Sequence, residues 1–134
     1  MKKLIPRLVV ADVGAIQGFY EAVLGVRVDP AFTQAGRVVH ADVFHGDEAV
    51  FSLGEAVGAD APEGPTPVVM ELETDDPDAL WARAMAHGAT VLHPLADQPY
   101  GHRAGRFRDP AGHQWMPYKV IREMSREEIQ ASLQ

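Results

Sequence analysis

The sequence predicts an α+β fold made of two copies of one module, each a strand, a helix and three further strands. Each half of the chain opens with a β-rich run, over residues 4–11 and 67–74. An aspartate follows each run, at Asp12 and Asp75. Because an aspartate side chain accepts hydrogen bonds from the free N–H groups of a first helical turn, we expect a helix to begin after each of them.

The expected helices cover residues 13–24 and 77–87, and both carry apolar residues at helical spacing. A glycine, Gly25 or Gly88, stands thirteen residues after each aspartate, where a helix favours one at its C-terminus. Further strands are expected over residues 37–44 and 48–53, and over 103–108 and 113–120. We therefore expect a single domain, with module one at about 1–54, a linker at about 55–66, module two at about 67–120, and a C-terminal tail or helix at about 121–134.

Composition excludes several classes of protein. The chain has 134 residues and no cysteine, so it can have neither a disulfide nor a thiolate metal site. Its net charge of −7 argues against a nucleic-acid partner. No apolar run approaches the roughly 20 residues of a membrane helix, and the N-terminus lacks the apolar stretch of a secretion signal. We expect a cytoplasmic protein with no membrane contact.

Three features together resemble the vicinal oxygen chelate superfamily: Phe19-Tyr20 in the first helix, Gly25 after it, and the segment 108–113 (Arg-Asp-Pro-Ala-Gly-His) before the last strand. The resemblance spans about residues 4–120 and is greatest to the glyoxalase, bleomycin-resistance-like and extradiol dioxygenase-like group. It implies modules that each curl a sheet into a half-barrel, and a homodimer with ligand grooves on the concave faces. That superfamily contains metal-dependent isomerases, dioxygenases and thiol transferases, and also metal-free proteins that sequester antibiotics.

The resemblance also implies where metal ligands would lie, on the first and last strand of each module. The matching positions are Ile5, Val69 or Met70, Phe51 or Ser52, and Met116. None of these side chains offers the imidazole or carboxylate of the metal enzymes. We therefore expect neither a metal nor another cofactor.

Alternation along the strands predicts which residues face the groove instead, because residues two apart share a face. Those residues are Ile5, Arg7, Val9, Phe51, Leu53, Val69, Glu71, Glu73, Gln114, Met116 and Tyr118. Leu8, Val10, Met70 and Leu72 are expected to pack under the helices, and Trp115 against a helix or a dimer partner. The predicted groove is apolar and aromatic with a few charges.

Glu71 and Glu73 are the most informative pair in this set. They could hold a cationic ligand or act as general acid and base. Alternatively, Arg7 pairs with one of them and the other is solvated.

Among the six histidines, His40 and His102 are candidates for ligand contact because they lie on related strands of the two halves. The other histidines suit structural roles: His45 and His113 flank turns, and His87 lies in a last helical turn. The resemblance also suggests that an aromatic and a basic residue of the segment 100–103, Tyr100 and Arg103, line the groove.

These observations favour a metal-free homodimer that sequesters or carries an organic ligand, cationic or aromatic, such as an antibiotic or another natural product. Two alternatives stay open. One is a glyoxalase- or dioxygenase-like enzyme with unconventional metal ligands such as His40, His102 and Glu71, or with a carboxylate acid/base. The other is an accessory module that binds a peptide or a protein.

Overall fold

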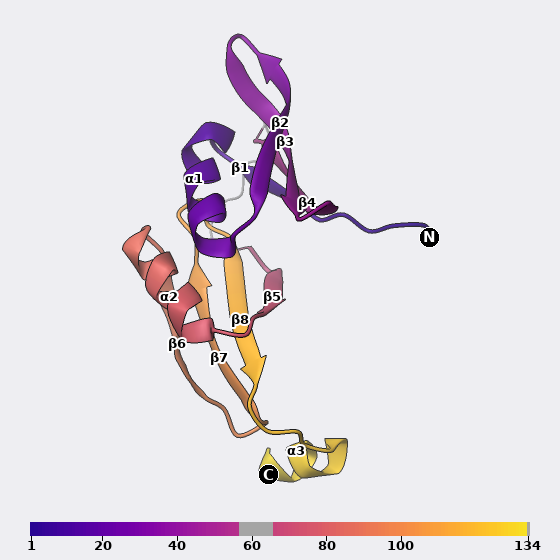
Figure 1. The fold of residues 1–134 in the computed structure, drawn as a ribbon, viewed down its shortest axis with the longest axis vertical. Helices are drawn as coiled ribbons and strands as arrows, with labels where there is room; N and C mark the ends of the chain where they lie inside the picture. Colours follow the sequence, from indigo (N-terminus) through magenta and orange to yellow (C-terminus); the bar gives the residue numbers. More distant parts are fainter. Residues whose placement is uncertain (57–65, 134) are drawn as a thin grey trace. The chain divides into compact units, whose positions relative to one another are not determined.

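The computed structural model describes residues 1–56 and 66–133, which form two compact units (Figure 1). Unit 1 comprises Met1–Pro67 and Pro110–His113, and unit 2 comprises Val68–Asp109 and Gln114–Gln134. Each unit repeats the order strand, helix and three strands, as the sequence predicts. Most of the expected linker at about 55–66 lies outside the described residues. None of the described helices is long and apolar enough to cross a membrane.

Unit 1 begins with a short strand and a well-capped helix. Its elements are β1 (Arg7–Val10), α1 (Val13–Leu24), β2 (Arg27–Gln34), β3 (Arg37–His45) and β4 (Glu48–Glu55). The Asp12 carboxylate accepts from the Ala15 N–H at 3.1 Å, and Gly25 ends the helix with φ of 67°. Both predicted helix signals therefore work as expected.

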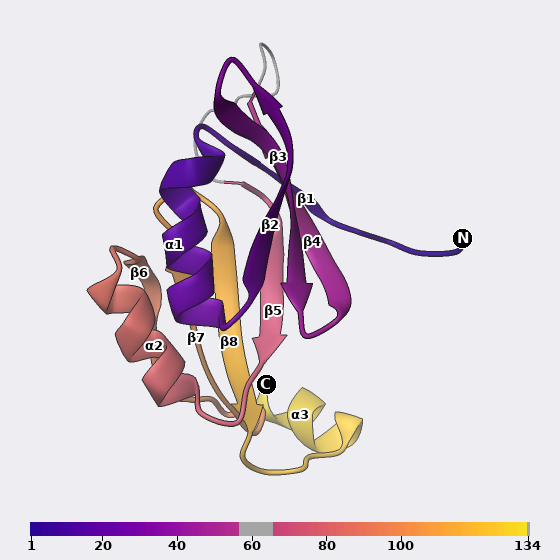
Figure 2. The ribbon, with the colours of Figure 1, turned by 45° about the horizontal axis from the view of Figure 1, so that its top comes forward.

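Unit 2 repeats this pattern with β5 (Val69–Glu73), α2 (Pro77–Ala86), β6 (Thr90–Asp97), β7 (His102–Arg108) and β8 (Gln114–Val120). The residue that caps α2 is Asp76 rather than Asp75: its carboxylate accepts from the Ala79 N–H at 3.0 Å. A third helix, α3 (Arg126–Ser132), follows β8 (Figure 2). Ser125 and Glu128 form the predicted capping box at its start.

Both units build a four-stranded mixed sheet with the same strand order. The order is β1-β4-β3-β2 in unit 1 and β5-β8-β7-β6 in unit 2. The first strand of each unit pairs in parallel with the last, and the remaining pairs are antiparallel. The sheets are curled but not closed, which agrees with the expected half-barrels. The sequence did not locate β2 and β6, the first strand after each helix. Both contain a proline, Pro30 or Pro94, which weakens a strand signal.

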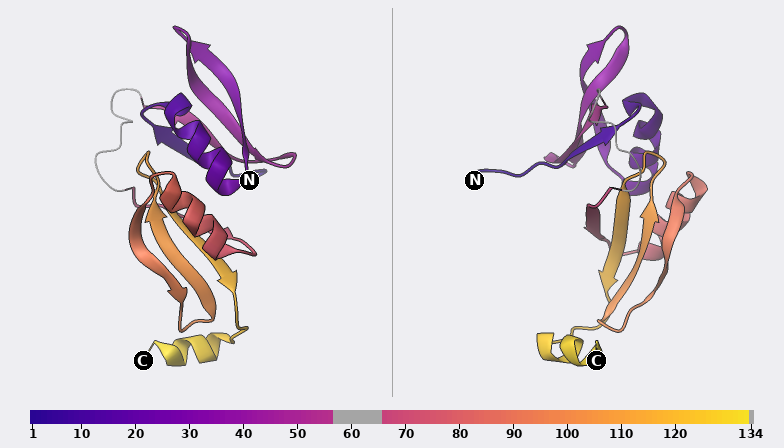
Figure 3. Two further views of the ribbon diagram at one scale, coloured as in Figure 1. Left: turned by 60° about the vertical axis from the view of Figure 1, so that its left-hand side comes forward. Right: turned by 180° about the vertical axis from the view of Figure 1, so that it is seen from behind.

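One face of each sheet packs against the helix of the same unit (Figure 3). In unit 1 the buried Leu8, Val10 and Val43 lie on this face, as does Phe51, whose ring contacts the fully buried Tyr20 of α1. In unit 2 the ring of Trp81, from α2, contacts Phe107 at 5.8 Å between centroids. The predicted packing of Leu8 and Val10 under the helix is confirmed. We call the face that the helix does not cover the open face of each unit.

The structure corrects the predicted direction of Phe51 and Leu53. Leu53 is opposite Leu8 in the parallel register, and Phe51 is opposite Val43, so both lie on the helix face. The Phe51 ring contacts the Tyr20 ring edge-on at 5.5 Å between centroids. The residues on the open face at this strand are instead Ser52 and Gly54. Phe51 is therefore a core residue and not part of an open-face site.

Candidate functional site

The open face of unit 2 brings together most of the residues that the sequence singled out. Phe107 and Trp115 are opposite one another on β7 and β8 and face α2, so their neighbours in sequence face the other way. The register places Glu71 opposite Met116, and Glu73 opposite Tyr118. The prediction that these four side chains share a face is confirmed. Glu71, Met116 and Tyr118 lie inside their strands, and Glu73 is the last residue of β5.

Three rings form an aromatic cluster at one end of this face, composed of Tyr100, His102 and Tyr118. His102 and Tyr118 are stacked, with centroids 4.9 Å apart and an angle of 10° between their planes. Tyr100 contacts His102 edge-on at 5.2 Å between centroids. Stacked and edge-on pairs hold rings at fixed angles, so the cluster is a preformed surface for a planar ligand.

A hydrogen bond connects this cluster to Glu73, one of the two carboxylates. The Tyr118 hydroxyl donates to the Glu73 carboxylate at 3.5 Å, a long hydrogen bond. Burial raises the pKa of the Tyr118 phenol, and the negative charges of Glu73 and Glu71 raise it further. The phenol therefore stays protonated at neutral pH and can donate to Glu73.

Glu71 and Glu73 themselves are exposed. Neither has an ion-pair partner within residues 1–56 and 66–133. The alternative in which Arg7 neutralises one of them would join residues of different units, and it stays a prediction. An exposed pair of carboxylates beside stacked rings can attract and hold a cation.

Two arginines on the same face were not singled out from the sequence. Arg108 is opposite Gln114, and strand alternation places Arg106 beside it on the open face. The Nε atoms of both are buried and have no hydrogen-bond partner among the described residues. Leaving a buried donor unpaired costs on the order of 1–3 kcal/mol. The signal was present in the sequence, because Arg106 and Arg108 are two apart, as Glu71 and Glu73 are.

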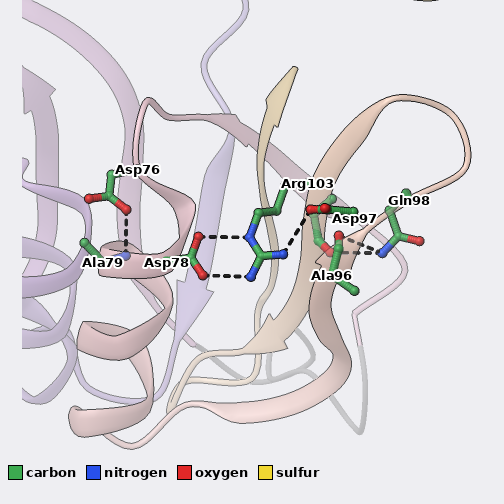
Figure 4. Close-up of polar contacts among 8 residues, drawn as sticks. Asp76, Asp78, Ala79, Ala96, Asp97, Gln98 and Arg103 are labelled. Carbon is green, nitrogen blue, oxygen red and sulfur yellow. Dashed lines mark hydrogen bonds and ion pairs between the residues drawn. The ribbon is translucent and has the colours of Figure 1, made fainter. Parts of the chain in front are cut away.

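Arg103 does not line this face, contrary to the sequence prediction. Its guanidinium donates from Nε and Nη2 to the two carboxylate oxygens of Asp78, at 2.9 and 2.8 Å, and from Nη1 to Asp97 at 3.0 Å (Figure 4). The bidentate hydrogen bond with Arg103 lowers the pKa of Asp78. Because β7 begins at His102, these two neighbours point to opposite faces of the sheet. Arg103 ties α2 to β6 and β7.

The open face of unit 1 carries a smaller group of polar residues. His40 lies 3.4 Å from Asp42 between Nε2 and Oδ1, and its ring is 5.8 Å from that of Phe32 between centroids. Arg7 lies across Gly54: a Cβ at position 54 would come within 2.6 Å of its Nη2. The structure thus places Arg7 and His40 on one open face, while His102 is on the other unit.

His113, expected to flank a turn, is buried and structural. Its Nε2 lies 2.8 Å from the Val9 carbonyl oxygen, within unit 1. The contact ties the turn before β8 to β1.

The metal that the resemblance implies does not fit the side chains at its expected positions. Ile5 and Val69 have no lone pair, and Met116 offers only a thioether. Within the part of the chain that the structure describes, no three His, Asp or Glu side chains come together as a metal cluster would.

Known proteins resemble the chain over nearly its whole length. A protein of Mycobacterium bovis described as "Uncharacterized protein Mb0911c" is 34% identical over 138 residues, covering 97% of this chain and 91% of that protein. The crystal structure of TioX from Micromonospora sp. ML1 has a TM-score of 0.70 at 24% identity, covering 90% of this chain and 100% of that one.

A glyoxalase/bleomycin resistance protein/dioxygenase family enzyme from Burkholderia phytofirmans PsJN has a TM-score of 0.69 at 16% identity, covering 86% of this chain and 95% of that one. At these identities the two solved structures show a shared fold. The model of one family, the Glyoxalase/Bleomycin resistance protein/Dioxygenase superfamily, matches residues 5–116. The chain therefore belongs to the glyoxalase/bleomycin resistance protein/dioxygenase superfamily.

Proposed function

We propose that this protein binds an aromatic organic cation on the open face of unit 2, without a metal. The observation that carries the proposal is the stack of His102 on Tyr118, at 4.9 Å, beside Glu71 and Glu73. A flat ligand would extend the stack, and its positive charge would lie near the two carboxylates. The family name supports the idea only in general terms, because the superfamily includes resistance proteins as well as enzymes.

The arrangement suits binding more than turnover. Each ring of the cluster is held by another ring, and Tyr118 is oriented by Glu73, so little freedom is lost when a ligand docks. The Tyr118 hydroxyl donates its proton to Glu73, so its oxygen can accept a hydrogen bond from an N–H or O–H group of the ligand. Sequestration or carriage of a natural product requires only these properties.

Isothermal titration calorimetry with two indoles tests the proposal. Tryptamine carries an ammonium group, and 3-ethylindole has the same ring without the charge. We expect tryptamine to bind more tightly, and Glu73→Gln to weaken tryptamine by about fivefold while leaving 3-ethylindole unchanged. Removing the ring with Tyr118→Ala should weaken both probes by about tenfold.

Glu48→Gln, on the exposed end of β4 in unit 1, serves as the matched control and should alter neither affinity. Equal binding of both probes, or wild-type binding by Tyr118→Ala, would contradict the proposal. All titrations are repeated with EDTA. Loss of tryptamine binding in the chelator would refute the metal-free part.

A further inference from the structure

Charges of opposite sign occupy opposite sides of the open face of unit 2. The acidic side is Glu71 and Glu73 on β5, and the basic side is Arg106 and Arg108 on β7. Strand β8 runs between them, with β5 and β7 as its two neighbours. Neighbouring strands are about 4.8 Å apart, so the two sides are separated by about 10 Å at the backbone.

Met116 and Tyr118 of β8 lie between the two sides. Met116 is opposite Glu71 and Tyr118 is opposite Glu73 in the parallel register with β5. On the other edge of β8, Tyr118 is opposite Ala104. The charged sides thus border a strip made of a thioether and a phenol ring, which a hydrophobic or aromatic body can cover.

Neither charged side is neutralised by the other. Within the described residues no ion pair joins Glu71 or Glu73 to Arg106 or Arg108. The buried Nε atoms of both arginines also lack hydrogen-bond partners there. A guanidinium with an unpaired, buried N–H can donate hydrogen bonds to a carboxylate or another planar anion.

We infer that the ligand is a zwitterion, with an aromatic middle and with its cationic and anionic groups on opposite sides of β8, at least about 10 Å apart. This inference rests on the proposed function, in which the cation and the ring are held by Glu73 and Tyr118, and adds the anionic end at Arg106 and Arg108. A ligand with the cation alone would leave the arginines unsatisfied. Charges on both ends would also fix the direction in which the ligand lies across β8.

A set of four tripeptides measures each charge separately on the unaltered protein. Gly-Trp-Gly has an ammonium and a carboxylate at the two ends of three residues, which span about 10 Å when extended. Its N-acetyl form lacks the cation, its C-terminal amide lacks the anion, and the doubly blocked form lacks both. We expect Gly-Trp-Gly to bind most tightly, at least about fivefold more tightly than the amide in calorimetry.

Arginine variants then locate the anionic end. Arg106→Gln and Arg108→Gln should each reduce the preference for Gly-Trp-Gly over its amide, and the double variant should abolish it. Binding of the amide itself should not change. Arg106→Lys keeps the charge and the fold but loses the planar fork, and it should retain only part of the preference. Arg126→Gln, on the exposed α3, is the matched control.

The outcomes separate this inference from the proposed function. If Gly-Trp-Gly and its amide bind equally while tryptamine still depends on Glu73, the zwitterion is refuted and the cation site stands. If the preference persists in the double arginine variant, the anionic end is elsewhere and the inference is likewise refuted. If neither tryptamine nor any tripeptide binds, both proposals fail.

Discussion

The two units share one backbone plan but differ in what their open faces carry. Both have the same strand order, the same parallel first pair, and a helix over one face. The helix faces are alike in kind: aromatic rings meet edge-on in each, Tyr20 with Phe51 and Trp81 with Phe107. The two units are therefore similar on the helix-covered face, which forms the core of each module.

The open faces are different. Unit 1 has His40 beside Asp42, and Phe32 with 67% of its surface exposed. Unit 2 has stacked rings beside two carboxylates, and two arginines on the same face. The fold requires an apolar helix face in both units, but it does not constrain the open faces in the same way. The open faces can therefore differ in sequence, and these differences indicate where a ligand would bind.

We expect the largest loss of stability from a substitution on the helix face, where the core of each unit lies. Tyr20→Ala removes a fully buried ring that contacts Phe19 and Phe51 edge-on. We expect a loss of about 3–5 kcal/mol in the free energy of unfolding, measured by urea denaturation. Tyr118→Ala on the open face should lower the free energy of unfolding clearly less than Tyr20→Ala. Similar losses for both would show that the open face of unit 2 is as structural as the core.

The glycines Gly105 and Gly54 differ in how much they can tolerate a side chain. A Cβ at Gly105 would lie 2.8 Å from the Leu95 backbone and 2.7 Å from the Trp81 ring, neither of which can move freely. A Cβ at Gly54 meets the side chain of Arg7, which can swing away. We expect Gly105→Ala to destabilise by about 1–3 kcal/mol and Gly54→Ala by less than about 0.5 kcal/mol. Urea denaturation checks both, and a reversed order would contradict the packing described.

The helix caps and the strand alternation show what a sequence can predict. Asp12 and Gly25 act over a few residues, so their signals survive in any fold, and strand alternation correctly grouped Glu71, Glu73, Met116 and Tyr118. Alternation says which residues share a face but not which face meets the helix. That depends on pairing register, which is set by contacts distant in sequence, and this is why the predicted direction of Phe51 is wrong.

The error at Arg103 has a different cause, because that prediction rested on the family resemblance and not on strand alternation. Pairing of Arg103 with Asp78 on α2 is a tertiary contact that no local pattern reveals. Arg106 and Arg108, by contrast, could have been found from the same two-residue spacing that identified the glutamates.

The smallest expected effect is a change in the titration of one phenol. Because burial and then Glu73 and Glu71 raise the pKa of Tyr118, Glu73→Gln should lower that pKa toward its ordinary value of 10.0. The raised pKa implies that stability declines as the pH rises above 10, since the unfolded chain releases this proton first. Ultraviolet titration of tyrosinate, with Tyr118→Phe to assign the signal, measures the shift. An unchanged or higher pKa in Glu73→Gln would contradict the contact.

We propose the open face of unit 2, and not that of unit 1, as the ligand site. The most direct measurement is a nuclear magnetic resonance titration of ¹⁵N-labelled protein with tryptamine. We expect the shifted amide signals to cluster at His102, Met116 and Tyr118 and at the neighbouring Glu71 and Glu73. Shifts concentrated instead at Arg7, His40 and Phe32 would place the site on unit 1 and contradict the claim.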